Sequence, residues 1–518
     1  MRTEPRRAAA LALAAALPLA LLGPAPGDLP AHLYRTELVR EGVFLWDTYW
    51  FGGHYPLAVY SPLYYFPAAL VGNEPLVVAA VVLAAALFAA VVREGWGERT
   101  RFAAYAFAVA ACGPLFTGTY PYAVGAAAAL GCLRLLQLGR VGRALLCAAL
   151  ALGFSPLAFA FLLIVLAAAG LARRRLDGRA VLVGGTLVAL ALLQVALLRL
   201  FPTESEYPFF RTLELFVVLG LGLACGALVV RAQQGRTLAL LFGLWLLAAL
   251  TAYAVPNPVG ENVTRLRMIA FPLALLAAAL AGYRPRLLAV GTVVAGLAYT
   301  LVPYVAVVPY RLDQRPAGRA FWEPALAYVA PRLDPGERLE IVPTGDHWDA
   351  YWPPSEDVPI ARGWYRQLDI GENPLFYREP LRPGEYRRWL SDRGVRFVLV
   401  PDTQLGRVGE EREAELLRSG AAGLERVHRS RTGDVYAVPP ERTAGVTVTR
   451  LGHDRVEGRV EAAGAHRLAL RDTPYWRVEE GDVCLRRAAD GATEVVARSA
   501  GPFVLGVGLF RRGPRCEG

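Results

Sequence analysis

The stretch Gly27–Tyr65 reads GDLPAHLYRTELVREGVFLWDTYWFGGHYPLAVYSPLYY, and it decides how the rest of the chain is interpreted. It follows one apolar segment directly and precedes a series of others. A segment that only joined two membrane helices could be short, whereas this one is rich in carboxylates, histidines and aromatic rings. Such a composition beside a membrane is typical of a site that handles a polar group carried on a lipid.

The overall composition indicates a membrane protein. The chain has 518 residues, of which 55% are hydrophobic and only 19% are charged, and its first 310 residues or so hold most of the apolar excess. The formal net charge is +10. Most N-terminal arginines stand in short clusters between apolar runs, where membrane topology explains them. We therefore expect no nucleic-acid partner.

Apolar segments long enough to be membrane helices, which need roughly 20 residues, recur through the first three-fifths of the chain. We expect about eleven membrane helices in a polytopic α-helical protein. The candidate segments are Ala8–Gly23, Pro75–Val92, Phe102–Phe116, Tyr122–Leu138, Ala144–Gly170, Ala180–Phe201, Thr212–Val230, Thr237–Val255, Leu266–Gly282 and Leu287–Val308.

Arginines predict the orientation. Clusters such as those at Arg93, Arg134 and Arg173 alternate with loops that hold few basic residues. The positive-inside rule then places the N-terminus in the cytoplasm and the C-terminal region outside the plasma membrane. The first segment also has features of a cleaved signal peptide, but no good cleavage site precedes Gly27, so we favour an uncleaved helix.

One segment interrupts the alternation. Ala144–Gly170 has arginine clusters at both ends and holds Gly153-Phe154-Ser155-Pro156 in its middle. Because proline interrupts a helix and glycine and serine favour turns, we predict two short helices that form a hairpin.

The composition changes near Tyr310 to charged and proline-rich. Short apolar runs of strand length alternate with helical patterns up to about Pro440, and short alternating strands follow. We predict three domains: a transmembrane domain at residues 1–309, an extracytoplasmic α/β domain at 310–440 and an extracytoplasmic β-rich domain at 441–518. An oxidising location would allow a disulfide between Cys484 and Cys516.

Asp28 is the candidate catalytic base. It lies just past the first apolar segment, and a carboxylate there can accept the proton of a hydroxyl group that attacks a sugar. His32 stands four residues later, so in a helix it would share a face with Asp28 and orient it or contact a phosphate. The alternative is that Asp28 caps a helix that begins near Leu29-Pro30.

The block PNPVGENVTRLR at residues 256–267 is the candidate phosphate site. Arg265 and Arg267 are costly near hydrocarbon unless they are paired or face water, and arginine binds phosphate through charge-assisted hydrogen bonds. Glu261 and Asn262 lie beside them. We expect this loop to converge with the first polar loop and with residues 203–211. The alternative is that the arginines pair with Glu261 or extend to lipid head groups.

The aromatic and polar residues of the first loop are candidates for flanking a sugar. This set consists of Trp46, Asp47, His54, Tyr60 and Tyr64. The alternative for the aromatic members is an interfacial belt. The C-terminal segments GDHWDAYW (345–352) and ARGWYRQLD (361–369) also suit sugars, although packing is the favoured interpretation there.

Motifs for nucleotide or metal chemistry are absent. The chain has no P-loop, no GxGxxG after a strand, no HExxH, no GxSxG and no DxD. A sugar donor would therefore arrive already attached to a lipid. The sequence identifies no cofactor and leaves open whether a divalent metal takes part.

The blocks GDLPAHLYR, WDTYWFGGHYP, YSPLYY and PVGENVTRLR together resemble bacterial GT-C-like membrane proteins. The nearest resemblance is to those catalogued as 6-pyruvoyl-tetrahydropterin synthase-related membrane proteins, including actinobacterial members. The resemblance covers nearly the whole chain. It implies a GT-C-like fold, a polyprenyl-phosphate sugar donor and a carboxylate in the first outer loop, which corresponds to Asp28.

We therefore predict a membrane glycosyltransferase of the cell envelope. Its expected partners are a polyprenyl-phosphate-linked sugar, a cell-envelope glycan or glycolipid acceptor, and membrane lipids. The alternative is a non-catalytic envelope protein that binds or transports a lipid-linked glycan.

Overall fold

The computed structural model describes residues 3–58, 60–173, 177–201, 206–232, 234–406, 408–440, 445–509 and 516. The chain divides into two compact units. The first comprises Met1–Leu29 and Val59–Arg311, and the second comprises Pro30–Ala58 and Leu312–Gly518. The first polar loop therefore belongs for the most part to the same unit as the C-terminal region.

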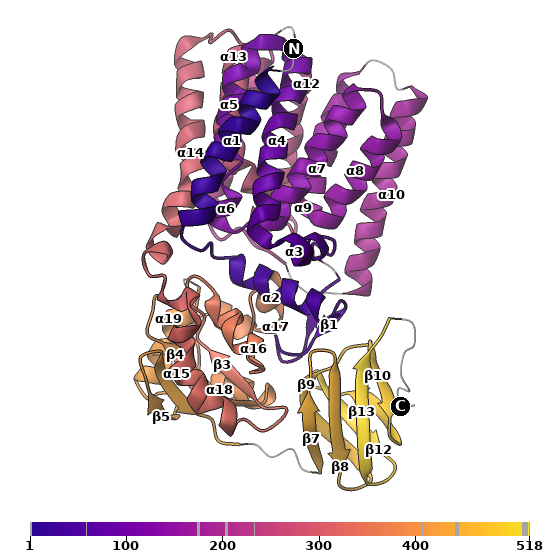
Figure 1. Cartoon of the computed structure of the whole chain (residues 1–518), viewed down its shortest axis with the longest axis vertical. Coiled ribbons are helices and arrows are strands. Elements are labelled where there is room, and N and C mark those ends of the chain that lie inside the picture. Colours follow the sequence, from indigo (N-terminus) through magenta and orange to yellow (C-terminus); the bar gives the residue numbers. More distant parts are fainter. Residues whose placement is uncertain are drawn as a thin grey trace. The chain divides into compact units, whose positions relative to one another are not determined.

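Each apolar segment expected from the sequence is helical in the first unit (Figure 1). The helices are α1 (Thr3–Leu22), α3 (Tyr65–Val71), α4 (Asn73–Trp96), α5 (Arg101–Ala110), α6 (Pro114–Thr117), α7 (Tyr120–Gln137), α8 (Val141–Phe154), α9 (Pro156–Ala172), α10 (Gly178–Leu200), α11 (Thr212–Val229), α12 (Arg236–Ala254), α13 (Ala270–Leu280) and α14 (Arg286–Leu312), with the 3-10 helices η1 (Gly97–Thr100) and η2 (Gly260–Ile269).

Among the described residues, seven helical segments are long and apolar enough to cross a membrane. They are Thr3–Leu22, Asn73–Thr117, Gly178–Leu200, Thr212–Val229, Arg236–Ala254, Gly260–Leu280 and Arg286–Tyr310. The expected number of about eleven counted shorter helices as well. The difference arises because α4, α5 and α6 form one such segment and because α7, α8 and α9 do not meet the criterion.

The predicted break inside Ala144–Gly170 is confirmed. Helix α8 ends at Phe154, Ser155 is extended, and α9 begins at Pro156. The Ser155 hydroxyl group accepts a hydrogen bond from the Ala158 N–H at 3.3 Å, so serine caps the new helix and proline occupies its first turn. Gly125 of α7 lies against this turn, and a Cβ atom there would be 2.7 Å from the Ser155 Cβ.

Helices α7, α8 and α10 lie side by side with α9 (Figure 1). They share an apolar core in which small and large side chains interlock. Its buried members are Cys132, Ala144, Ala148, Ala151, Leu152, Phe159, Leu162 and Leu187.

The second unit begins with residues 30–58, which form most of the first polar loop. This segment has regular secondary structure. It contains α2 (Leu29–Arg40) and a short hairpin of β1 (Trp46–Asp47) and β2 (Tyr55–Pro56). The segment between these strands bonds to later parts of the unit. The Thr48 N–H donates to the His453 carbonyl at 2.7 Å, and the Ile360 N–H donates to the Tyr49 carbonyl at 2.8 Å.

The α/β part of this unit contains a four-stranded mixed sheet in the order β3 (Arg338–Ile341), β4 (Val395–Pro401), β6 (Gly433–Ala437) and β5 (Glu425–Arg429). Strands β3 and β4 are parallel, and the other pairs are antiparallel. The helices around it are η3 (Arg315–Ala317), α15 (Arg319–Val329), η4 (Ala330–Arg332), η5 (Trp348–Ala350), α16 (Trp352–Ser355), α17 (Arg366–Glu372), η6 (Pro374–Tyr377), α18 (Pro383–Asp392) and α19 (Glu410–Arg418).

Within residues 445–509, the regular elements are all strands. One sheet has the order β10 (Trp476–Glu480), β13 (Gly501–Val507), β8 (Arg455–Val460), β7 (Val446–Leu451), and the other has the order β11 (Val483–Arg487), β12 (Ala492–Ala497), β9 (Gly464–Arg471). Both sheets contribute to one core around Trp476 and Phe503, so this part is a β-sandwich. A disulfide joins Cys484 to Cys516, a pairing that the sequence allowed but left open.

The predicted fold class is confirmed: a polytopic helical membrane region is combined with α/β and β-rich structure. The division at residues 309 and 440 stays a prediction.

Candidate functional site

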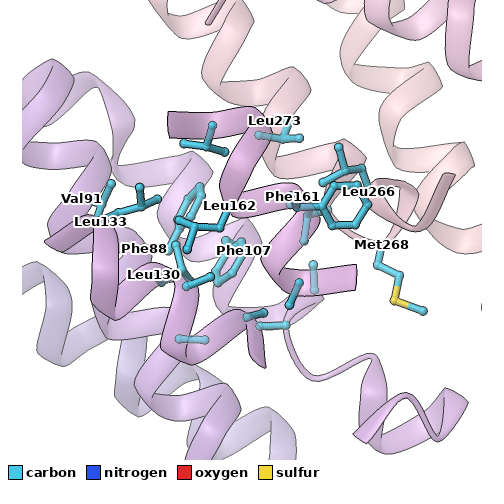
Figure 2. A pocket seen from close by; sticks show the side chains of 18 of the residues that line it. Phe88, Val91, Phe107, Leu130, Leu133, Phe161, Leu162, Leu266, Met268 and Leu273 are labelled. Atoms are coloured by element: carbon cyan, nitrogen blue, oxygen red, sulfur yellow. The ribbon is translucent and has the colours of Figure 1, made fainter. Parts of the chain in front are cut away.

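An apolar cavity of about 220 Å³ lies among the helices of the first unit. Figure 2 shows Phe88, Phe107, Phe161, Leu266 and Met268 around this space. These side chains come from α4, α5, α9 and η2, which are far apart in the sequence. A cavity with such a lining suits a hydrocarbon chain, because nearly all of the side chains around it are apolar.

Arg265 lies beside this cavity. Its sequence neighbour Leu266 lines the cavity, and so does Tyr122, whose hydroxyl group lies within electrostatic reach of Arg265. The Arg265 Nε donates to the Asn262 Oδ1 at 2.9 Å. Within the described residues, no carboxylate lies within ion-pair distance of Arg265. Among the described residues, its hydrogen-bond partner is therefore a neutral amide.

Arg267 differs from Arg265 because it already has an anionic partner. Its Nη1 lies 3.1 Å from the Glu214 Oε1, and the Tyr299 hydroxyl donates to the Glu214 Oε2 at 2.9 Å. Arginine pairing was foreseen as an alternative, but the partner is Glu214 of α11 rather than Glu261. An ionisable residue in the first turn of an apolar helix was the sequence signal that could have identified Glu214.

Two of the three loops expected to converge do so, as far as their described residues show. The Tyr207 N–H donates to the Asn257 carbonyl at 2.9 Å, and the Phe210 N–H donates to the Glu261 Oε2 at 2.8 Å. Residues 203–205 lie outside the described part of the chain. Glu261 thus has a role in holding these loops together.

Asp28 stands in the turn just before α2 and packs against Gly118, at the end of α6. The backbone of Gly118 is left-handed (φ +87°), and a Cβ atom there would lie 2.7 Å from the Asp28 nitrogen and 2.8 Å from its Cβ. Asp28 is partly exposed. Gly118 ends α6 and is separated from the start of α7 by Thr119, and Tyr122 stands in the first turn of α7. Asp28 therefore lies near the start of α7, the helix whose first turn also carries Tyr122.

His32 lies in α2 and is 5% exposed. Because α2 begins at Leu29, Asp28 precedes the helix rather than forming part of it. The helix start agrees with the alternative interpretation of Asp28 as a residue at a helix N-terminus.

Asp47 is fully buried in the second unit and is surrounded by donors. The Tyr34 hydroxyl donates to its Oδ2 at 2.9 Å, the Tyr49 N–H donates to its Oδ1 at 3.1 Å, and the His453 Nδ1 lies 2.8 Å from Oδ1. Burial disfavours the charged form of His453, but the hydrogen bond and charge of Asp47 outweigh it and raise the pKa of His453. Both carboxylate oxygens of Asp47 therefore have partners within the second unit.

Trp46 and His54 also have internal partners. Their rings stack at 5.0 Å, and the Trp46 Nε1 donates to the Gly53 carbonyl at 2.9 Å. The His54 Nδ1 lies 2.8 Å from the Glu372 Oε1. These side chains build the packing of the second unit.

The two tyrosines belong to the first unit. Tyr60 is partly exposed, whereas Tyr64 is fully buried and its hydroxyl donates to the Asn73 Oδ1 at 2.8 Å. The Tyr64 hydroxyl is therefore hydrogen-bonded to the first residue of α4.

The segment at residues 345–352 is largely packed into the α/β part. Trp348 and Tyr351 are buried, and the Asp349 Oδ1 accepts hydrogen bonds from the Thr344 N–H and hydroxyl. Burial raises the pKa of Asp349 to about 7. Among the described residues, no group of three or more His, Cys, Asp or Glu side chains is arranged to hold a metal ion.

The fold defines a multi-pass helical membrane protein with a second unit of α/β and β-sandwich structure. Two solved structures that resemble the chain are cryo-EM classes of a mutant arabinofuranosyltransferase AftD from Mycobacteria. Each is 16% identical, with TM-scores of 0.45 and 0.44, and the matches cover 90% and 89% of this chain. The chain spans 43% of the length of each. No protein-family model and no curated protein sequence matches the chain.

Proposed function

We propose that this protein is a membrane glycosyltransferase that moves a sugar from a polyprenyl-phosphate donor to a cell-envelope glycan or glycolipid at the outer face of the plasma membrane. The observation that carries the proposal is the charge of Arg265 beside an apolar cavity of about 220 Å³. A lipid phosphate needs both features, because its chain is apolar and its head group is anionic.

In the proposed reaction, a hydroxyl oxygen of the acceptor attacks the anomeric carbon of the donor sugar. The bond between that carbon and the phosphate oxygen breaks, and the polyprenyl phosphate leaves with the electron pair. The Asp28 carboxylate accepts the hydroxyl proton, and the configuration at the anomeric carbon inverts. Arg265 stabilises the charge on the departing phosphate.

His32, Asn262 and Glu261 take supporting roles in this proposal. Asn262 accepts a hydrogen bond from Arg265 and so orients its guanidinium group, while Glu261 holds the loop through Phe210. His32 lies in α2, which begins after Asp28, and its part in orienting Asp28 stays a prediction. The internal contacts of Trp46, Asp47 and His54 favour a packing role for them over direct contact with sugar.

The proposed topology has a cytoplasmic N-terminus and an external second unit. Arginine-rich helix ends gather in one place in the first unit, which supports this orientation. The Arg93 Nη1 lies 2.9 Å from the Glu4 Oε2, and the Arg134 Nη1 lies 3.4 Å from the Glu94 Oε2. The ends of α4 and α7 therefore lie with the start of α1, as the positive-inside rule requires.

The decisive experiment measures sugar transfer from a polyprenyl-phosphate donor by the purified full-length protein. We expect Asp28→Asn to slow transfer by roughly 10²- to 10⁴-fold without loss of donor binding, because it removes the base and keeps the shape. Asp177→Asn is the matched control, since Asp177 caps α10 through a hydrogen bond that asparagine can also accept.

Transfer at the wild-type rate by Asp28→Asn would reject Asp28 as the base. The cavity and Arg265 would serve a non-catalytic binder or transporter of lipid-linked glycans equally well. Tight donor binding by the wild-type protein without transfer to any acceptor would favour that second function.

A further inference from the structure

The two arginines of the 3-10 helix η2 are not equivalent in the structure. Arg265 has a neutral partner, Asn262, whereas Arg267 lies 3.1 Å from the Glu214 carboxylate. The sequence assigned both to the lipid phosphate. We propose that Glu214 and Tyr299 are positioning residues that hold Arg267 and with it η2, so that Arg265 is the cation that η2 presents to the anionic head group. This inference rests on the proposed function.

The first argument concerns η2 itself. It extends over 10 residues, Gly260–Ile269, whereas 3-10 helices longer than three or four residues are uncommon because their hydrogen bonds have poor geometry. A segment of this kind needs support from its surroundings to keep one conformation.

The structure supplies that support from three helices. The Trp245 Nε1 of α12 donates to the Val263 carbonyl at 3.1 Å, and the Thr300 hydroxyl of α14 donates to the Arg267 carbonyl at 2.9 Å. From α11, Glu214 binds the Arg267 side chain. Arg267 is therefore held at both its backbone and its side chain.

Charge and burial also support a structural role for Arg267 and a binding role for Arg265. The side chains of Arg267 and Glu214 are 21% and 11% exposed, so each needs the other as a counter-ion near the apolar helices. Tyr299 donates to the second Glu214 oxygen at 2.9 Å and fixes the carboxylate. Arg267 shares its charge with Glu214, although its Nε has no hydrogen-bond partner among the described residues, whereas the described hydrogen-bond partner of Arg265 is the neutral Asn262.

The test combines lipid binding with hydrogen exchange on the full-length protein in lipid nanodiscs. The probes are undecaprenyl phosphate and the neutral alcohol undecaprenol, and exchange is followed across Gly260–Ile269. The variants are Arg265→Gln, Arg267→Met, Glu214→Met and the double variant with both methionines. Arg231→Gln serves as the control, since Arg231 is exposed beyond the end of α11.

We expect Arg265→Gln to weaken binding of the phosphate roughly ten- to hundredfold and to leave binding of the alcohol and the exchange of η2 unchanged. Either single methionine variant leaves an unpaired charge, so it should speed exchange in η2 and weaken binding of the phosphate. The double variant removes both charges, so it should restore exchange and bring phosphate affinity to within about twofold of wild type. Tyr299→Phe should speed exchange and keep the affinity for the alcohol.

Three outcomes would overturn the inference. A double variant with restored exchange but phosphate binding as weak as that of Arg267→Met would make Arg267 itself a phosphate ligand. Unchanged phosphate binding by Arg265→Gln would remove Arg265 from the site. Exchange in η2 that does not respond to Glu214→Met would reject positioning. By contrast, a wild-type protein that binds phosphate and alcohol equally would reject the proposed lipid donor, while the exchange data would still decide whether Glu214 positions η2.

Discussion

The Nδ1 atom of His453 lies 2.8 Å from the Oδ1 atom of the fully buried Asp47. On the other side of the ring, Nε2 lies 3.5 Å from the Glu41 Oε2. An imidazolium can donate from both nitrogens, whereas a neutral imidazole can donate from only one. His453 stands in the turn between β7 and β8, and Thr48 bonds to the backbone of the same turn. The ion pair therefore ties the first polar segment to the β-sandwich.

The first prediction is that the stabilisation by the Asp47–His453 ion pair depends on pH. Asp47 raises the pKa of His453 above the unfolded value of about 6.5. The stabilisation is therefore complete below about pH 6.5 and is lost as the pH rises through the folded pKa. The protection factors for hydrogen exchange at residues 451–455 of the full-length protein, which correct for the intrinsic rise of exchange with pH, should fall as the pH rises through the folded pKa, and His453→Gln should abolish this fall. The groups facing the ring are Asp47, Glu41, Asp357, Tyr34 and Tyr49.

His428→Gln is the control for this experiment. The His428 ring stacks on Tyr328 at 4.3 Å, away from any carboxylate partner among the described ion pairs. Its substitution should leave the exchange profile of residues 451–455 unchanged. An unaltered pH profile in His453→Gln would show that another group is responsible.

The second prediction concerns the turn between α8 and α9. Gly125→Ala places a methyl group 2.7 Å from the Ser155 Cβ and 3.0 Å from the Ala158 Cβ, so the hairpin must move. We expect a loss of about 1–3 kcal/mol in the free energy of unfolding. Gly170→Ala is the matched control, because nothing lies within 4 Å of a Cβ atom there and alanine is the better helix former. Equal stability of the two variants in a denaturation experiment would contradict the close contact.

The third prediction concerns Glu372, a buried carboxylate with three basic neighbours. It lies 2.8 Å from the His54 Nδ1, 3.2 Å from the Arg393 Nη2 and 2.9 Å from the Arg471 Nη2. Glu372→Gln leaves these groups without their counter-ion and should cost about 3–5 kcal/mol of stability. Glu379→Gln is the control, since Glu379 is 79% exposed and its pair with Arg412 should matter by about 1 kcal/mol or less.

The pH dependence of this cluster has the opposite sign to that of His453. Burial of Glu372 opposes ionisation, but His54, Arg393 and Arg471 outweigh it and lower the pKa of the carboxyl group. The stabilisation is therefore complete above the unfolded value of about 4.3 and is lost as the pH falls toward the folded pKa. Denaturation curves of wild type and Glu372→Gln should converge at acidic pH. A gap that stays constant down to strongly acidic pH would mean that charge is not the cause.

The fourth prediction tests the disulfide and the proposed topology together. Cys484 and Cys516 are bonded, and they are separated by 32 residues. Replacing both by serine should cost about 3–4 kcal/mol, because the unfolded chain regains the freedom of that loop. In intact cells, a membrane-impermeant thiol reagent should label this pair only after mild reduction. Labelling of the pair without reduction, or only after cell lysis, would contradict an oxidised external location.

The sequence alone was sufficient for the membrane helices and for the break at Ser155-Pro156. Both depend on local composition and covalent geometry, since a long apolar run forms a helix and proline cannot continue one. The sequence left the pairing of Cys484 with Cys516 open, because it depends on an oxidising location as well as on distance, and the structure shows the bond. The strands of the C-terminal half followed from short alternating runs.

The candidate site was predictable in part. The sequence singled out Asp28 and Arg265, because a carboxylate and a guanidinium group beside apolar segments stand out by residue type alone. It grouped them with Asp47 and Arg267, which have the same side chains in similar surroundings. Only the structure distinguishes Asp28 from Asp47 and Arg265 from Arg267. Asp47 forms an ion pair with His453, and Arg267 forms one with Glu214.

What the sequence determined by itself is the set of helices and strands and the residue types at their ends. The tertiary structure decided which described charges have a partner of opposite sign. The reason is physical: the interaction of two charges depends on their distance and burial, and His453 is 406 residues from Asp47 along the chain. No local pattern contains that distance, so the different partners of Arg265 and Arg267 emerge only when the chain is folded.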